Sequence, residues 1–141
     1  MCLPELYRCA ENNRIPVLQR PLPLCGSLSL DTGSQCVIGL DPSVCDRGKR
    51  ERVHLSHELG HCLTGSFYTA HSPFDLRRRH ENRADKWAIR ALIPESALDE
   101  AVAAGKCTLW ELADHFGVTE DFMEKAVCLH VHGNLATELY F

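Results

Sequence analysis

The chain has 141 residues, of which 45% are hydrophobic and 24% charged, as in soluble globular proteins that bury a core. No apolar run approaches the roughly 20 residues of a membrane span, and residues 1–5 lack the charged and apolar regions of a secretion signal, so we expect a cytoplasmic protein without a membrane segment. The formal net charge of −4 argues against a general nucleic-acid-binding protein, which normally carries a basic excess.

The first part of the chain predicts a short helix and a β-hairpin. Residues 4–13 are expected to form the helix, and residues 15–24, which contain three prolines, an extended connection. Two apolar-rich runs follow, residues 26–30 and 35–40, on either side of a turn that contains glycine. This arrangement is typical of a β-hairpin.

The middle of the chain predicts two longer helices. From about residue 48 the apolar positions follow a helical period, and Gly65 supplies the stop signal. Residues 64–75 contain glycine, serine and proline and are expected to form a loop. A second helix is predicted over residues 79–91 and has to end near Pro94.

Three shorter helices are predicted after this, over residues 94–104, 108–116 and 119–131. Thr108 and Thr119 are the expected caps of the last two helices.

The C-terminal part, residues 106–131, resembles a helix-turn-helix. The helix that would read DNA carries three acidic residues and one basic residue near its start, which is unfavourable for contact with phosphates. We therefore expect a structural or protein-binding role and no direct nucleic-acid binding. The complete pattern, a small hairpin followed by helices, predicts an α+β fold in a single domain over residues 1–141.

Eight cysteines are scattered along the chain without any C-x-x-C pair. In a reducing compartment most of them are expected to be small, buried, apolar residues without a disulfide framework. Cys62 adjoins His61 and is the one cysteine that could compete for a metal there. On a helix it lies roughly 100° around from His61, so this role is the less favoured one.

His57, Glu58 and His61 form the pattern H-E-x-x-H within the first long helix. On a helix, residues four apart point to the same side, so both imidazoles can bind one ion. Zinc accepts two such nitrogens and keeps a position for water. Glu58 supplies a carboxylate that can take a proton from this water, and the pattern therefore indicates metal-assisted hydrolysis.

Such a site needs a third protein ligand, and the candidates after the motif are Asp75, His80, Glu81 and Asp85. Glu81 and Asp85 are four residues apart on the next predicted helix, so their carboxylates share one face. One can bind the metal while the other accepts the free ring N–H of a ligand histidine, which fixes the tautomer of that ring.

Residues 52–61, which end in His-Glu-Leu-Gly-His, are followed by a Glu-Asn-Arg-Ala-Asp-Lys-Trp-Ala segment at residues 81–88 and by Leu-Ile-Pro at 92–94. Together they resemble the ImmA/IrrE family of metallopeptidases. The likeness extends over about residues 26–131 and implies a minimal zincin-like fold, a bound Zn²⁺ ion and peptidase activity. Ser56 is a departure, because the family more often has alanine there, although serine is also small.

Position by position, the resemblance implies that His57, His61 and Glu81 bind zinc and that Glu58 is the general base. It also implies that Asp85 supports the site from behind a ligand.

The tetrahedral oxyanion needs a further hydrogen-bond donor. Tyr68, His71 and His80 lie in or beside the loop between the two ligand helices, and any of them could serve. Of the three we favour Tyr68.

Members of the resembled family commonly cleave helix-turn-helix repressors encoded beside them in phages or mobile elements. We therefore expect a zinc-dependent endopeptidase of regulatory type with such a repressor as its protein substrate. Two alternatives stay open: a non-catalytic zinc-containing protein-binding module, and a transcription regulator that uses the C-terminal helices. Glu58 argues against the first, because a pure binding site does not need that carboxylate, and the acidic helix argues against the second.

Overall fold

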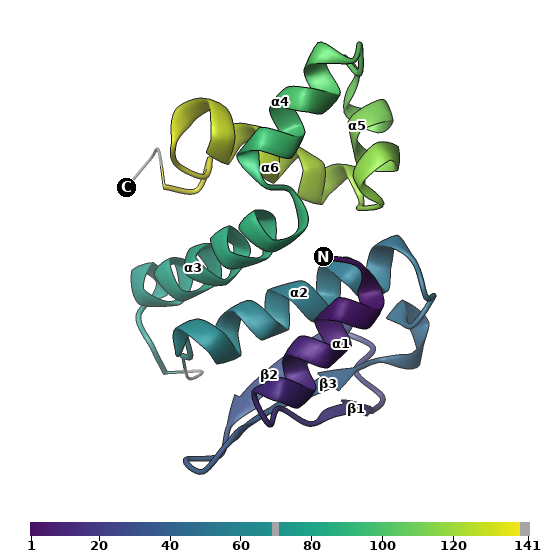
Figure 1. Ribbon diagram of the computed structural model, residues 1–141. Helices are drawn as coiled ribbons and strands as arrows, with labels where there is room; N and C mark the ends of the chain where they lie inside the picture. The colour runs from purple at the N-terminus through teal and green to yellow at the C-terminus, as the bar shows by residue number, and fades with distance from the viewer. Residues whose placement is uncertain (69–70, 139–141) are drawn as a thin grey trace.

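The computed structural model describes residues 1–68 and 71–138 and has an α+β arrangement, as predicted. Figure 1 shows two long helices, α2 and α3, side by side between a small sheet and a group of C-terminal helices. In chain order the elements are α1 (Leu3–Asn12), β1 (Val17–Gln19), β2 (Ser27–Asp31), β3 (Cys36–Leu40), the 3-10 helix η1 (Pro42–Val44), α2 (Lys49–Thr64), α3 (Phe74–Leu92), α4 (Glu95–Ala103), α5 (Leu109–Phe116) and α6 (Glu120–His132).

The sheet has the strand order β1-β3-β2. The antiparallel pair of β2 and β3 confirms the predicted hairpin. Strand β1 pairs parallel to β3, and this strand was missed because prolines surround its three residues, which left only an extended connection in the prediction. Among the described residues β2 pairs with β3 alone, and residues 27–30 of this edge strand lie beside the helices that carry the candidate site.

The two long helices follow the predicted pattern except at one end. Helix α2 ends at Thr64, directly before the predicted stop at Gly65. Helix α3 begins at Phe74, five residues earlier than predicted. The earlier start was not predicted because the charged first turns of α3 lack an apolar period. Two interactions stabilise these turns: Asp75 lies at the N-terminus, where the helix dipole favours an acid, and Arg78 packs over the ring of Phe74. The predicted loop is correspondingly shorter, and its residues 69–70 lie outside the described part.

Helices α2 and α3 approach each other through their main chains at Gly60. A Cβ atom at this position would lie 2.5 Å from the carbonyl oxygen of Ala84 and 3.0 Å from its Cα, which is closer than real contacts allow. Glycine therefore permits the close crossing of the two helices that carry the candidate ligands.

The hydrophobic core is continuous across α2. Leu55 and Leu59 of α2 are fully buried, as are Ile38 of the sheet and Ile89 of α3. No helix within the described residues is long and apolar enough to cross a membrane.

The C-terminal helices begin as predicted. The side chain of Thr108 caps α5 by accepting a hydrogen bond from the main-chain amide of Glu111. The side chain of Thr119 caps α6 in the same way, with the amide of Phe122 as donor. Helix α6 packs against α5 and α3, so the helix-turn-helix-like part shares contacts with the rest of the fold.

The expectation that most cysteines are buried apolar residues is wrong, and one pair of them is bonded. Cys36 of β3 and Cys62 of α2 form a disulfide with a Cα–Cα distance of 5.7 Å. The pairing could not be read from the sequence because the packing of α2 on the sheet joins positions 26 residues apart. The free cysteines of the described residues are exposed or partly buried. The sulfur of Cys62 is bonded to Cys36 of β3 and in this state does not compete for a metal at His61.

Candidate metal centre and active site

Helix α2 presents the two histidines of the motif on one face. His57 and His61 are one turn apart, and their Nε2 atoms lie 3.2 Å from each other. His61 is buried and His57 is partly buried, so both rings have limited contact with water. The helical spacing thus does what the sequence predicted, bringing two imidazole nitrogens to one point.

Glu81 of α3 completes the group. Its Oε2 lies 2.8 Å from Nε2 of His57, and its Oε1 lies 3.2 Å from Nε2 of His61. One ligand atom from each of the three residues lies within 4.8 Å of the others. Of the other sequence candidates, Asp75 is exposed in the first turn of α3 and His80 stacks its ring on that of Tyr68.

The far side of each histidine ring is held by an oxygen. Nδ1 of His57 lies 2.8 Å from Oδ1 of Asp85, and Nδ1 of His61 is hydrogen-bonded to the main-chain carbonyl of Ser66. These contacts hold a proton on Nδ1, which turns both Nε2 atoms toward Glu81. Asp85 thus lies where the resemblance placed it. Ser66 was missed, because a carbonyl acceptor leaves no mark in a side-chain pattern.

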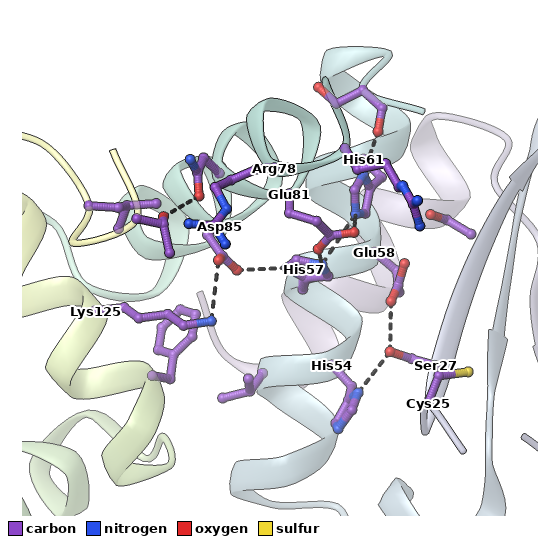
Figure 2. A pocket seen from close by; sticks show the side chains of 18 of the residues that line it. Cys25, Ser27, His54, His57, Glu58, His61, Arg78, Glu81, Asp85 and Lys125 are labelled. Atoms are coloured by element: carbon purple, nitrogen blue, oxygen red, sulfur yellow. Dashed lines mark hydrogen bonds and ion pairs between the residues drawn. The ribbon is translucent and has the colours of Figure 1, made fainter. Parts of the chain in front are cut away.

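Lys125 of α6 extends this arrangement (Figure 2). Its Nζ lies 3.3 Å from Oδ2 of Asp85, so the carboxylate bridges a ligand histidine on α2 and a lysine of the C-terminal helices. Lys125 was also missed, since its distance in sequence hides the contact.

The electrostatics of the group favour a cation. Burial lowers the pKa of His57, but hydrogen bonds with Asp85 and Glu81 outweigh it and raise the pKa to about 10. Burial raises the pKa of Glu81, yet hydrogen bonds from His57 and His61 hold it well below its ordinary value. The pKa of Asp85 is also lowered, against burial, by His57 and Lys125. Both carboxylates are therefore ionised at neutral pH and attract positive charge.

Glu58 lies beside this group, with its carboxylate in the wall of the cleft. It is buried, and its Oε2 accepts a hydrogen bond of 2.7 Å from the hydroxyl of Ser27 on β2. The same hydroxyl lies 2.7 Å from Nδ1 of His54 (Figure 2). The roles of Ser27 and His54 were not predicted, because no local pattern in the sequence links a strand residue to the following helix.

Tyr68 reaches the metal group from the loop after α2. Its hydroxyl donates a 2.7 Å hydrogen bond to Oε1 of Glu81. Burial and this hydrogen bond raise the pKa of Tyr68 to about 12, so the phenol keeps its proton. His80 lies behind it in a ring stack, and His71 is exposed. Tyr68 as the oxyanion donor remains a prediction, now with a phenolic O–H beside the ligands.

Ser56, the departure from the family pattern, fits its place. It is fully buried on α2, and its hydroxyl donates to the carbonyl oxygen of Val53 at 3.0 Å. A satisfied hydroxyl can be buried without a large cost.

The group opens into a cleft of about 1290 Å³. Its walls come from the exposed edge of β2, from α2 and α3, and from α6 with the residues that follow it. The lining mixes charged groups with exposed apolar side chains such as Leu28, Leu30 and Phe74. Such a cleft can take an extended chain with both polar and apolar side groups.

His57, His61 and Glu81 can together hold a metal ion, and the carboxylate of Glu58 lies beside them (Figure 2). This combination is typical of metallopeptidases. The chain belongs to the peptidase family described as the IrrE N-terminal-like domain, whose model matches residues 14–127. This match confirms the ImmA/IrrE resemblance. No curated protein and no solved structure gives a significant match.

Proposed function

We propose that the protein is a zinc-dependent endopeptidase. The observation that carries this proposal is the placement of Glu58 next to a His57–His61–Glu81 group. Two histidines and one glutamate are a donor set of catalytic zinc sites, and the ionised carboxylate of Glu81 and the two oriented rings suit a divalent cation. Zinc, when held there, would polarise the scissile carbonyl and lower the pKa of a water molecule toward neutrality.

Each residue around the metal group then has its own role in the proposed reaction. Glu58 takes the proton of the attacking water and returns it to the leaving amine. Asp85 and the Ser66 carbonyl keep the ligand rings in their orientation. The Tyr68 hydroxyl, already within reach of Glu81, is the proposed donor to the negative charge that develops on the carbonyl oxygen.

We further propose a protein substrate, a helix-turn-helix repressor of a phage or mobile element encoded beside this protein. Two points support this substrate. Members of the resembled family commonly cleave such repressors, and the cleft of this protein is open and of mixed polarity. A DNA-bound repressor would also place the peptidase in the cytoplasm.

The decisive experiment compares Glu58→Gln and Glu81→Ala with Glu100→Gln, a change of an exposed residue on α4. Zinc content is measured by elemental analysis, and cleavage with the neighbouring repressor as substrate. Glu58→Gln should keep zinc and lose cleavage by about 10²–10⁴-fold, because general base catalysis contributes that much. Glu81→Ala should lose zinc, and the control should match the wild type. Cleavage by Glu58→Gln at the wild-type rate contradicts the mechanism.

A further inference from the structure

Ser27 joins the carboxylate of Glu58 to the ring of His54. The hydroxyl of Ser27 lies 2.7 Å from Oε2 of Glu58 and 2.7 Å from Nδ1 of His54 (Figure 2). Ser27 and Glu58 are buried, and His54 is partly buried. In this setting a hydrogen bond is little disturbed by water, so it can fix the direction of the carboxylate.

The chemistry of the three groups fixes which of them donates. The hydroxyl of Ser27 donates its single hydrogen to Oε2 of Glu58. The contact between Ser27 and His54 then requires a proton on Nδ1 of His54. Burial lowers the pKa of His54, which favours a neutral ring with one N–H. The hydrogen bonds therefore run from His54 to Ser27 and from Ser27 to Glu58.

The main chain before Ser27 is shaped for this contact. Gly26 has a φ of +75°, and a Cβ atom there would lie 2.9 Å from Cε1 of His54. A side chain at this position would meet the ring and strain the backbone. Glycine thus lets β2 begin directly against His54, so that the next residue, Ser27, reaches both partners.

We propose that Ser27, held by His54, is a positioning residue that orients Glu58 for proton transfer. With Oε2 engaged by Ser27, Oε1 is the oxygen that we assign to the attacking water. A carboxylate that can rotate freely spends part of its time away from the water, whereas an anchored one is preorganised. This proposal rests on the proposed function, in which Glu58 is the general base.

The first test uses Ser27→Ala, Ser27→Thr and Ser96→Ala, a change of an exposed serine on α4. Cleavage of the neighbouring repressor is measured as kcat and KM, together with zinc content. Ser27→Ala should lower kcat roughly 10-fold, the effect of losing one hydrogen bond to a charged group, with KM and zinc content unchanged. Ser27→Thr keeps the hydroxyl and should recover most of kcat. An unchanged kcat in Ser27→Ala overturns the proposal.

The second test separates the donor of His54 from its bulk. His54→Asn places an amide N–H where Nδ1 lies, whereas His54→Leu fills space without a donor. His54→Leu should lower kcat several-fold, and His54→Asn should stay closer to the wild type. Equal losses of kcat in both variants would show that the ring acts only by packing and would contradict the proposed hydrogen bond from His54 to Ser27.

The third test does not depend on activity. Nitrogen-15 NMR of the wild-type protein with zinc should show His54 protonated at Nδ1, and Ser27→Ala should weaken this preference. A wild-type ring protonated at Nε2 alone contradicts the proposal, since Nδ1 would then compete with Glu58 for the hydrogen of Ser27. If the wild type cleaves no repressor, the proposed function fails, while the tautomer of His54 still decides whether this chain of hydrogen bonds exists.

Discussion

The two ligand histidines and Glu58 each have a second residue that fixes them. Asp85 holds the ring of His57, the Ser66 carbonyl holds that of His61, and Ser27 holds Glu58. Without these contacts the side chains would lose rotamer freedom only when the metal or the substrate binds, at a cost of about 0.5–1.5 kcal/mol for each ordered side chain. The site is thus arranged before either arrives.

Replacing Asp85 should weaken metal binding without removing a ligand. Asp85→Asn keeps the size of the side chain but loses the charge that His57 and Lys125 face. We expect zinc affinity to fall about 10–100-fold, as for other oriented ligand histidines. Competition with a chromophoric chelator measures the affinity, and Asp99→Asn on the exposed face of α4 is the control. Equal affinities for the two variants would exclude a supporting role for Asp85.

At the scale of elements, α2 is the helix on which the fold is assembled. The sheet and α3 both pack against it, so the histidines of α2 contact Glu81 of α3 while Glu58 of α2 contacts Ser27 of the sheet. The disulfide of Cys36 and Cys62 adds a covalent link between α2 and β3. This link lies one residue from His61 and ties the ligand helix to the sheet.

The disulfide should stabilise the fold. Closing a loop between positions 26 residues apart restricts the unfolded chain, for which about 2–4 kcal/mol is typical. The double variant Cys36→Ala/Cys62→Ala should lose that amount in the free energy of unfolding, as measured by urea titration. Cys107→Ala, a change of an exposed free cysteine, should leave it unchanged. If a reducing agent does not shift the wild-type transition toward that of the double variant, the disulfide is not formed in solution.

At the scale of the molecule, the C-terminal helices belong to the site as well as to the body. Lys125 of α6 faces Asp85, and Thr137 donates a 2.6 Å hydrogen bond to Asn82 of α3. Helix α6 therefore packs with Lys125 toward the metal group, while Glu120, Asp121 and Glu124 remain exposed near its start. We expect this surface to repel phosphate groups.

The protein should not retain DNA. With a net charge of −4 and an acidic start of α6, counterion release cannot drive binding. A fluorescence anisotropy titration with mixed-sequence double-stranded DNA at low salt should show no binding at micromolar protein concentration. Tight retention that depends on the DNA sequence would favour the transcription-regulator alternative.

The sequence predicted what local periodicity determines. The hairpin, the ends of α2 and the ligand pair His57 and His61 all follow from spacing within a few residues. Strand β1, the cysteine pair and Ser27 depend on which elements pack together, and local spacing in the sequence does not show this. Glu81 lies between these cases, because its helix was predicted locally while its role came from the family resemblance.

The main-chain contact between Gly60 and Ala84 has a consequence for the choice of metal. Helices that already touch through their backbones cannot move closer, so the gap between the α2 and α3 ligands has a lower limit set by carbonyl and Cα atoms. Ions of different radius have to be accommodated by rotation of the histidine and glutamate side chains. The hydrogen bonds that hold these side chains oppose such rotation, so we expect the frame to favour ions of one size over others.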